Sequence, residues 1–340
     1  MFPVALLSLK LPENPTKFSN HFSNLVEIYS AVGLTTKIFV SVEINSKFPF
    51  SLIQKIISLY YNTASYANQH MNAIITPIRS DLEILSNEKE IAVFYVQDQT
   101  SEKNVELLNK VNETRKQNSF PLVSFRKLDL IKLSYTIYSI QKKMWEECKF
   151  TDEFIPPNSL SGIVIGGTFD RLHTGHRALL TMACYLSSEH ILIGLTTWKL
   201  IEKKEFSSFI EPYETRSENL LKFIYSVSPK LKPEIVPLED PFGPSITSDN
   251  IQGIIVSEET QKGAEEINRI RKEKNLKILE IFVIDFVLQL GGQNRKTKLS
   301  SSTLRKEEWK RSFSSLTENP FSFSSIGENP FTNLTQNQNN

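Results

Sequence analysis

The chain has 340 residues, which is more than one typical domain, and its 40% hydrophobic residues can bury a sizeable core, so we expect two domains. Its 39 Lys and Arg residues balance 38 Asp and Glu residues, which excludes a protein that attracts nucleic acid or an anionic membrane through overall positive charge. Cys148 and Cys184 lack metal-site spacing, and no secretion signal or apolar run of about eighteen residues occurs. We therefore expect a cytoplasmic protein without a membrane span that acts on small molecules.

The first half of the chain, residues 1–150, alternates apolar runs with amphipathic stretches. Strands are expected at 4–9, 36–44, 91–96 and 121–125, and helices near 17–31, 50–70, 102–116 and 130–147. This alternation is typical of an α/β domain. His21 and His70 have no partner motif at usable spacing, so we expect both to be structural or exposed. The sequence does not indicate a role for this domain.

A linker is expected at 151–160, because the Pro-Pro-Asn sequence at 156–158 interrupts both helix and strand. The alternation then restarts in a second domain, residues 161–311. Strands are expected at 162–165, 191–195, 234–238, 253–257 and 278–284, with helices from about Gly175 and near 213–226 and 261–275. Helices between successive strands predict right-handed crossovers and a mainly parallel, Rossmann-like sheet.

The final segment, residues 312–340, is rich in Ser, Asn and Thr. Such a composition cannot bury enough apolar surface to offset the entropy of ordering, so we expect a disordered tail. Asn-Pro-Phe occurs twice in it, at 319–321 and 329–331, and resembles the short ligand of EH-type adaptor domains. An EH-type partner is the alternative reading of this segment.

The segment SGIVIGGTFDRLHTGHRALL runs from an apolar strand through two glycines into an apolar helix. Gly166 and Gly167 let backbone N–H groups approach a phosphate, and the helix start near Gly175 adds a positive dipole. His173 and His176 lie at the carboxyl end of the strand, where open α/β sheets bind ligands. The segment lacks both the P-loop and the dinucleotide fingerprint, and no third Cys or His favours zinc. It therefore predicts an anion site.

GGTFDRLHTGH resembles the first signature of the HxGH nucleotidyltransferase superfamily, and is closest to eukaryotic-type phosphopantetheine adenylyltransferase as found in CoA synthase. The segments that also match, in order, are LIEKKEFSSFIEPYETR (200–216), EDPFGPSITSD (239–249), IVSEETQKGAEEINRIR (255–271) and KLSSSTLRK (298–306). The resemblance covers about 160–311. It implies that ATP and 4′-phosphopantetheine give dephospho-CoA and pyrophosphate, with Mg²⁺ bound to ATP and no metal held by the protein.

The resemblance also implies roles for individual residues. Thr168 would orient the attacking phosphate, His176 would hold the ATP phosphates, and Lys204 would contact phosphate, although Lys199 and Lys203 lie near enough to leave that choice open. The residues expected to bind ATP are Gly166, Gly167, Phe169, His173, Gly175, Ser257, Glu258, Glu259, Thr260, Ser300, Ser301, Ser302, Thr303 and Arg305. Those expected near phosphopantetheine are Asp170, Asp240 and Gly243, the last two with a structural turn as the alternative.

The implied reaction needs no general base, because the acceptor phosphate is already an anion. The protein must align two anions and neutralise the charge that develops between them. Two alternatives stay open: adenylyl or cytidylyl transfer to another phosphate substrate, and a scaffold for a CoA-synthesising assembly. The bacterial enzymes carry an arginine-rich segment here that this chain lacks until Arg269 and Arg271. No P-loop for a following kinase occurs, so the product is expected to be dephospho-CoA.

Overall fold

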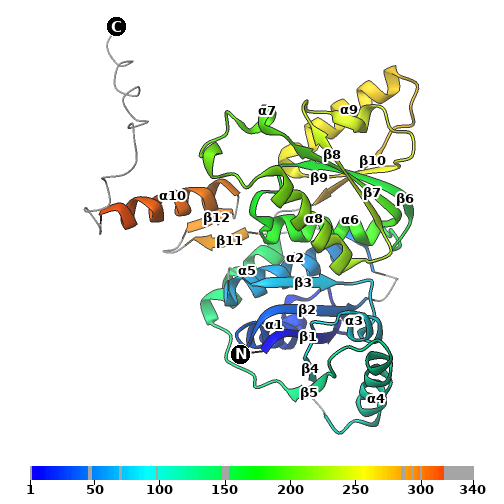
Figure 1. Ribbon diagram of the computed structural model, residues 1–340, viewed down its shortest axis with the longest axis vertical. Coiled ribbons are helices and arrows are strands. Elements are labelled where there is room, and N and C mark those ends of the chain that lie inside the picture. Colours follow the sequence, from blue (N-terminus) through cyan, green and yellow to red (C-terminus); the bar gives the residue numbers. More distant parts are fainter. Residues whose placement is uncertain are drawn as a thin grey trace.

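The computed structural model describes residues 2–44, 48–68, 71–96, 99–147, 153–284, 288–291, 295–298 and 301–317. It contains two five-stranded parallel sheets, one in each half of the chain, flanked by helices (Figure 1). The prediction of two consecutive α/β domains is therefore confirmed. Residues 318–340, with both Asn-Pro-Phe sequences, lie outside the described residues, as do His70 and Cys148.

The first sheet has the strand order β3-β2-β1-β4-β5. Its strands are β1 (Phe2–Lys10), β2 (Thr35–Glu43), β3 (Asn72–Thr76), β4 (Val93–Val96) and β5 (Ser124–Lys127). The helices of this domain are α1 (Phe22–Val32), α2 (Phe50–Ala67), α3 (Asp81–Asn87), α4 (Glu102–Gln117) and α5 (Tyr135–Glu147). The sequence analysis did not single out β3 or α3.

The second sheet has the strand order β10-β9-β6-β7-β8. Its strands are β6 (Leu160–Gly167), β7 (Ser187–Thr196), β8 (Lys232–Leu238), β9 (Gly253–Ser257) and β10 (Glu280–Ile284). The remaining elements are α6 (Thr174–Leu186), α7 (Trp198–Ile201), α8 (Tyr213–Val227), α9 (Gln261–Glu273), the unpredicted hairpin β11 (Leu288–Gly291) and β12 (Arg295–Lys298), and α10 (Ser301–Thr317). Residues 312–317 thus continue α10, which corrects the expected start of a disordered tail at 312.

The alternation of side chains along β6 places the second sheet between two hydrophobic clusters. Ile163 and Ile165 belong to a large cluster, which also contains residues of α6 and α8 and the buried hydrophobic residues of the first domain. Val164, between them, belongs to a smaller cluster under α9. The two domains therefore share one core, and α2 packs against α6 at their junction (Figure 1).

The two sheets are built alike. In each, the first strand in the sequence lies at the centre, with the second and third strands on one side and the fourth and fifth on the other. The registers also agree. Ala5, the fourth residue of β1, pairs with both β2 and β4, and Ile163, the fourth residue of β6, pairs with both β7 and β9. The first domain is therefore a structural repeat of the second.

A buried arginine near the end of the helix that precedes the last strand of each sheet supports this repeat. Arg115 Nε of α4 donates to the Pro121 carbonyl at 2.6 Å, and Arg271 Nε of α9 donates to the Lys277 carbonyl at 2.7 Å. Both guanidinium groups donate to further carbonyls of neighbouring loops, and both are buried. Each arginine thus fixes the turn that leads into the last strand of its sheet.

An asparagine one turn earlier in each helix repeats in the same way. Asn112 donates to the Val123 carbonyl at 3.0 Å and accepts from the Val123 N–H at 2.9 Å. Asn268 donates to the Leu279 carbonyl at 2.8 Å and accepts from the Leu279 N–H at 2.7 Å. Such agreement of side-chain contacts goes beyond shared topology.

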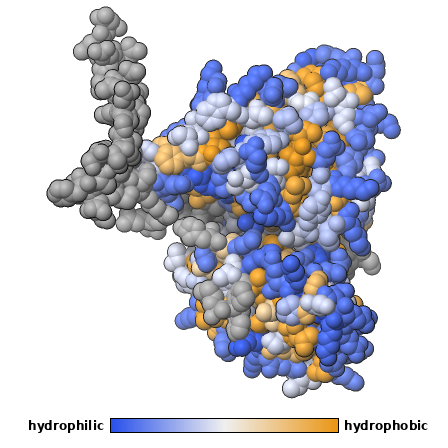
Figure 2. All heavy atoms as spheres, in the orientation of Figure 1, coloured by the Kyte–Doolittle hydropathy of each residue, from blue (hydrophilic) through white to orange (hydrophobic). Residues whose placement is uncertain are grey.

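No helix among the described residues is long and apolar enough to cross a membrane. On the face seen in Figure 2, hydrophobic residues lie in separate groups between hydrophilic ones.

Replacing Arg115 should destabilise the first domain, because its side chain donates to five carbonyls: those of Leu85, Glu88, Lys89, Ile91 and Pro121. We expect Arg115→Met to lower the free energy of unfolding by about 2–4 kcal/mol, measured by urea denaturation. Lys116→Met, at the next and exposed position of α4, is the control and should change it by less than about 0.5 kcal/mol. Equal effects of the two substitutions would contradict this role.

Candidate active site

The candidate site lies at the carboxyl edge of the second sheet. β6 pairs with β7 on one side and with β9 on the other, and the chain reaches β9 only after completing β7 and β8. The direction of the strand order therefore reverses between β6 and β9, which is the point where doubly wound sheets bind ligands. Residues 166–176, which we call the signature turn, connect β6 to α6 at this point.

The signature turn has a strained backbone. Phe169 and Arg171 both adopt left-handed conformations, with φ of 47° and 51°. Each costs roughly 1–3 kcal/mol in a residue other than glycine, so the surroundings must impose it. The Phe169 ring is buried, and a Cβ added to Gly167 would lie 3.1 Å from it. Gly166 and Gly167 themselves are the last residues of β6, and their expected approach to phosphate stays a prediction.

Thr168 follows directly on β6 and is held by two neighbours. Its Oγ1 accepts a hydrogen bond from Lys204 Nζ at 2.7 Å and another from Thr196 Oγ1 at 3.2 Å. Its carbonyl accepts from the buried Arg216 at 2.8 Å. Because a hydroxyl has two lone pairs and one proton, this arrangement leaves the Thr168 proton to be donated to a ligand.

Lys204 is the lysine that reaches the signature turn, whereas Lys199 lies near Glu239, at 3.8 Å. Partial burial and the charges of Arg305 and Arg216 lower the pKa of Lys204 from its usual value of 10.5. Three cations gathered in this way favour an anionic ligand. The geometry thus prefers Lys204 among the lysines that the sequence left open, although its catalytic role stays a prediction.

His173 and His176 are stacked on each other, with ring centroids 3.8 Å apart. His173 is the N-cap residue of α6, and a Cβ on Gly175 would lie 3.2 Å from its ring. The His176 ring also contacts Phe169, at 5.3 Å between centroids. The structure therefore brings the two histidines together at the N-terminus of a helix, as the sequence predicts, and Gly175 allows the close approach.

Burial, followed by the charges of His173, Arg177 and Lys204, holds the pKa of His176 well below its usual value of 6.5. Its Nδ1 atom is buried and has no hydrogen-bond partner among the described residues. The folded protein therefore disfavours protonation of His176, and a neutral imidazole has one N–H group that can donate a hydrogen bond without a full charge.

Asp170 forms a buried ion pair with Arg305 of α10, with Nη1 and Oδ2 at 2.8 Å. The Asp170 carboxylate is 0% exposed and also accepts from the Glu211 N–H at 3.0 Å and from Arg171. Asp170 joins the signature turn to α10, and its expected contact with phosphopantetheine stays a prediction. Arg305, 2% exposed, forms the other half of this joint, and its expected contact with ATP stays a prediction.

The hydroxyl-rich start of α10 lies against the signature turn. Ser301 Oγ donates to the Asp170 carbonyl at 2.9 Å, and Ser302 Oγ accepts from Arg305 Nη2 at 3.0 Å. Thr303 is half-buried in the first turn of α10, and Ser300 lies outside the described residues. The two signature segments are therefore neighbours, and contacts of these residues with ATP stay predictions.

Residues 257–260 connect β9 to α9 and form a capping box, in which Ser257 and Thr260 satisfy each other's backbone. Ser257 is buried, whereas Glu258, Glu259 and Thr260 are exposed. Because β9 is next to β6, these residues lie at the same edge of the sheet as the signature turn. A local structural role explains Ser257 and Thr260, and contact with adenosine stays a prediction for all four.

Asp240 closes the loop after β8. Its Oδ1 accepts from the N–H groups of Gly243 at 2.7 Å and Phe242 at 2.8 Å, and these bonds lower the pKa of Asp240. Gly243 has a φ of 49°, and a Cβ there would lie 2.3 Å from Leu238. The geometry accounts for both residues as parts of a structural turn, and their contact with substrate stays a prediction.

The sequence analysis did not single out Thr196 or Arg216. Arg216 donates to the carbonyls of Glu211, Thr168 and Thr196, and so fixes the ends of β6 and β7 relative to α8. The only available signal was its position at the end of the matched segment 200–216. A buried arginine that binds carbonyls leaves no mark of its own in a sequence.

Among the described residues, no group of three His, Cys, Asp or Glu side chains could hold a metal ion. His21, expected to be structural, is buried and hydrogen-bonded to Tyr60 Oη and to the Pro15 carbonyl.

Comparison with known proteins identifies the class and then the family. A family model described as cytidylyltransferase-like matches residues 164–307, in agreement with the nucleotidyltransferase class that the sheet and signature turn define. Phosphopantetheine adenylyltransferases from Methanopyrus kandleri and Thermococcus kodakarensis are each 41% identical, over 43% and 42% of this chain and 88% and 83% of their own lengths. The chain therefore belongs to the phosphopantetheine adenylyltransferase family.

A Saccharomyces cerevisiae protein named phosphopantetheine adenylyltransferase is 34% identical over 172 residues. The match covers 50% of this chain and 54% of the yeast protein, so it spans about half of that relative's length.

Removing the charge of Asp170 should leave Arg305 buried without its counter-ion. We expect Asp170→Asn to lower the free energy of unfolding by about 3–5 kcal/mol at neutral pH, measured by chemical denaturation. Glu308→Gln removes an exposed carboxylate that pairs with Arg171, and should cost less than about 1 kcal/mol. If the two variants lose equal stability, the joint between the signature turn and α10 does not depend on the buried pair.

The depressed pKa of His176 predicts a pH-dependent contribution to stability. Below the ordinary pKa of about 6.5 the unfolded chain takes up a proton that folded His176 resists, so this contribution is present above that pH and is lost on acidification. His176→Gln has no such group. We expect the stability of wild type relative to His176→Gln to fall as the pH is lowered from about 7.5 to about 5, measured by urea unfolding; a constant difference would refute the depressed pKa.

Proposed function

We propose that this chain transfers the adenylyl group of ATP to 4′-phosphopantetheine, giving dephospho-CoA and pyrophosphate. The observation that supports it best is the convergence of Thr168, Lys204 and the stacked histidines at the carboxyl end of β6. Hydrogen-bond donors and one cation lie together there beside a helix N-terminus, and such a combination can bind several phosphates. The names of the archaeal and yeast relatives point to the same nucleotide and acceptor.

The reaction is an in-line attack by an acceptor phosphate oxygen on the α-phosphorus of ATP, with pyrophosphate leaving. Thr168, whose lone pairs are occupied by Lys204 and Thr196, donates its proton to the acceptor phosphate and orients it. Lys204 supplies a permanent positive charge between the two anions. His176 donates to the oxygens of ATP on which charge grows in the transition state. No residue has to remove a proton from the nucleophile.

Mg²⁺ would accompany ATP and neutralise part of the phosphate charge. Hydroxyls, imidazoles and cations surround the signature turn, and the carboxylates that bind the turn are engaged by the chain itself. Asp170 is buried against Arg305, Glu211 accepts from the Arg171 N–H, and Glu308 pairs with Arg171. This donor set fits a metal held by the phosphate oxygens of ATP rather than by the chain.

Pyrophosphate release, measured with the purified chain and a panel of nucleotides and acceptors, tests the proposal. ATP with 4′-phosphopantetheine should give pyrophosphate and dephospho-CoA in equal amounts. Faster release with CTP, or with phosphocholine or nicotinate mononucleotide as acceptor, would favour the alternative transferases. Absence of release with every pair would favour a scaffold without catalysis.

Loss of the His176 donor should reduce turnover and leave the fold intact. We expect His176→Ala to lower kcat by about 10²–10³, because the lost hydrogen bond forms most strongly in the transition state. His190→Ala, a change of the same kind at a histidine in β7, is the control. Near-normal turnover of folded His176→Ala protein would remove His176 from the mechanism.

The proposal includes three further assignments. The chain would act in the cytoplasm and within a CoA-synthesising assembly. The Asn-Pro-Phe sequences of the tail would bind an EH-type domain.

A further inference from the structure

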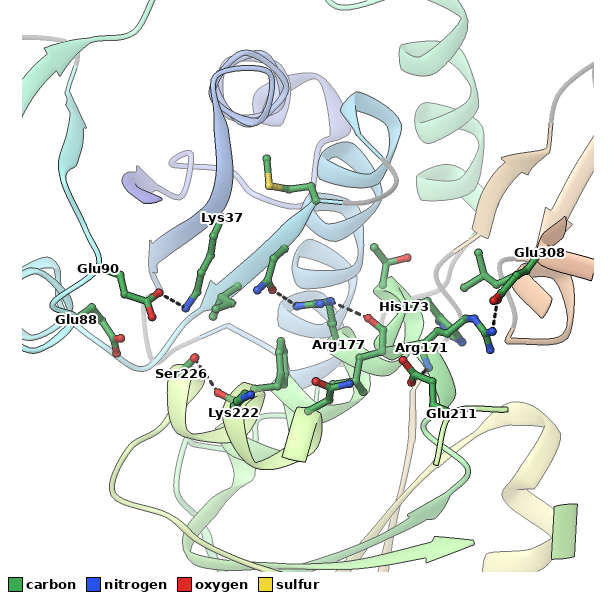
Figure 3. A pocket seen from close by; sticks show the side chains of 18 of the residues that line it. Lys37, Glu88, Glu90, Arg171, His173, Arg177, Glu211, Lys222, Ser226 and Glu308 are labelled. Carbon is green, nitrogen blue, oxygen red and sulfur yellow. Dashed lines mark hydrogen bonds and ion pairs between the residues drawn. The ribbon is translucent and has the colours of Figure 1, made fainter. Parts of the chain in front are cut away.

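A cavity of about 710 Å³ lies between the two domains, next to the signature turn (Figure 3). One wall is formed by β3 of the first domain and another by α8 of the second. His173, Thr174 and Arg177 line it from the start of α6. The first domain therefore approaches the catalytic histidines from the side opposite β6, and the residue that spans this distance is Arg177.

Arg177 connects three parts of the molecule. Its Nε donates to the Leu172 carbonyl of the signature turn at 2.9 Å. Its Nη1 donates to Asn72 Oδ1 at 2.6 Å and to the Ala73 carbonyl at 3.2 Å, both in β3 of the first domain. The guanidinium also lies over the Phe223 ring of α8, 5.3 Å from the centroid.

The bonds of Arg177 act directly on the segment that holds the histidines. The backbone N–H of Arg177 donates to the His173 carbonyl at 3.0 Å. The Arg177 side chain donates to the carbonyl of Leu172, the residue just before His173. His176 is the residue before it in α6. A shift of the Arg177 side chain would therefore move both stacked imidazoles relative to Thr168.

The charges around the cavity show that Arg177 is not there to balance an acid. Among the described residues it forms no ion pair. Three of the acids that line the cavity have other cations as partners: Glu90 binds Lys37, Glu88 binds Arg79 and Glu308 binds Arg171. A fourth, Glu211, accepts from the Arg171 N–H at 2.8 Å. Burial lowers the pKa of Arg177 from its usual value of 12.5. The Arg177 side chain is partly buried, and its hydrogen bonds go to two carbonyls and one amide oxygen, so it acts mainly on geometry.

The repeated domain provides an internal comparison. His21 is the N-cap residue of α1, as His173 is of α6. Tyr60 Oη lies 3.2 Å from His21 Nδ1 and accepts from Asn24 Nδ2 at 2.7 Å, so these side chains fill the space around His21. Leu25 follows Asn24 where Arg177 follows His176, and it is buried in the core. The first domain thus has a closed counterpart of the signature turn and contributes no second phosphate site of this kind.

We propose that Arg177 is a positioning residue through which the first domain, by way of Asn72 and Ala73 of β3, holds the signature turn in its catalytic geometry. This inference rests on the proposed adenylyl transfer. It gives the first domain a function that its own closed turn cannot supply.

Asn72→Ala tests the contact from the first domain, at an exposed position outside the candidate site. We expect kcat to fall about 10-fold with little change in KM, because displaced donors misalign the reacting phosphates. Asn72→Asp keeps an oxygen acceptor for Arg177 and should restore turnover to within about 2-fold of wild type. Arg177→Lys retains the charge but cannot make all three bonds, and should resemble Asn72→Ala.

Arg79→Met is the matched control. Arg79 also bridges the domains, donating to the Ser226 carbonyl at 2.8 Å, but it does not touch the signature turn. We expect lower thermal stability and wild-type kcat for this variant. If Arg79→Met reduces kcat as much as Asn72→Ala, the effect is general loosening of the domain interface and the proposal is overturned.

Histidine side-chain NMR gives a readout independent of turnover, since the chain has only 5 His residues. The ring signals of His173 and His176 should shift in Asn72→Ala and stay unchanged in Arg79→Met. Unshifted signals, or shifted signals with wild-type kcat, would overturn the proposal. If wild type makes no product with ATP and phosphopantetheine, the proposed function fails separately, and shifted ring signals would still place the turn under the control of the first domain.

Discussion

The buried ion pair between Asp170 and Arg305 is the constraint on which the rest of the site depends. It joins segments 135 residues apart in sequence, the strained turn after β6 and the helix α10. A buried pair is weak evidence for stability, because desolvation offsets most of the attraction, but it has few alternative arrangements. Both members of the pair also make other hydrogen bonds: Asp170 accepts from the Glu211 N–H, and Arg305 donates to the Glu205 carbonyl. The pair therefore fixes where the two signature segments meet, and the left-handed residues of the turn can persist because this contact holds them.

The repeat of the domain gives the turn its second support. An edge strand normally exposes unpaired backbone groups. The free side of the edge strand β3 is covered by the second domain: Arg177 donates to the Ala73 carbonyl and Thr181 donates to the Ile75 carbonyl. Tyr61 Oη, 2.9 Å from Thr181 Oγ1, adds a further contact at the same junction. Because α2 and α6 share one core, the first domain cannot move without disturbing the helix that follows the signature turn. The first domain thus supports the signature turn of the second.

Sequence patterns predicted the long strands and helices, because buried β-branched runs and amphipathic periods dominate them. They missed β3, although β3 is the strand that touches Arg177. The signature residues were recognisable because phosphate chemistry restricts both their type and their spacing. Asp170 and Arg305 were recognised as members of the signatures, but their partners depend on how distant segments meet. The repeat escaped notice because loops of unequal length separate its matching strands, so the sequence has no constant period.

The electrostatics of the site separate binding from catalysis. Under the proposed reaction, Lys204, beside Arg216 and Arg305, would attract phosphate in the ground state as well as in the transition state. Such uniform attraction would raise affinity and do little for kcat. His176, whose pKa is lowered by burial and by neighbouring cations, would donate most strongly when charge grows on an ATP oxygen. A second permanent cation at this position would bind ATP more tightly without that selectivity, so under the proposed reaction the depressed pKa of His176 is itself part of the catalytic design.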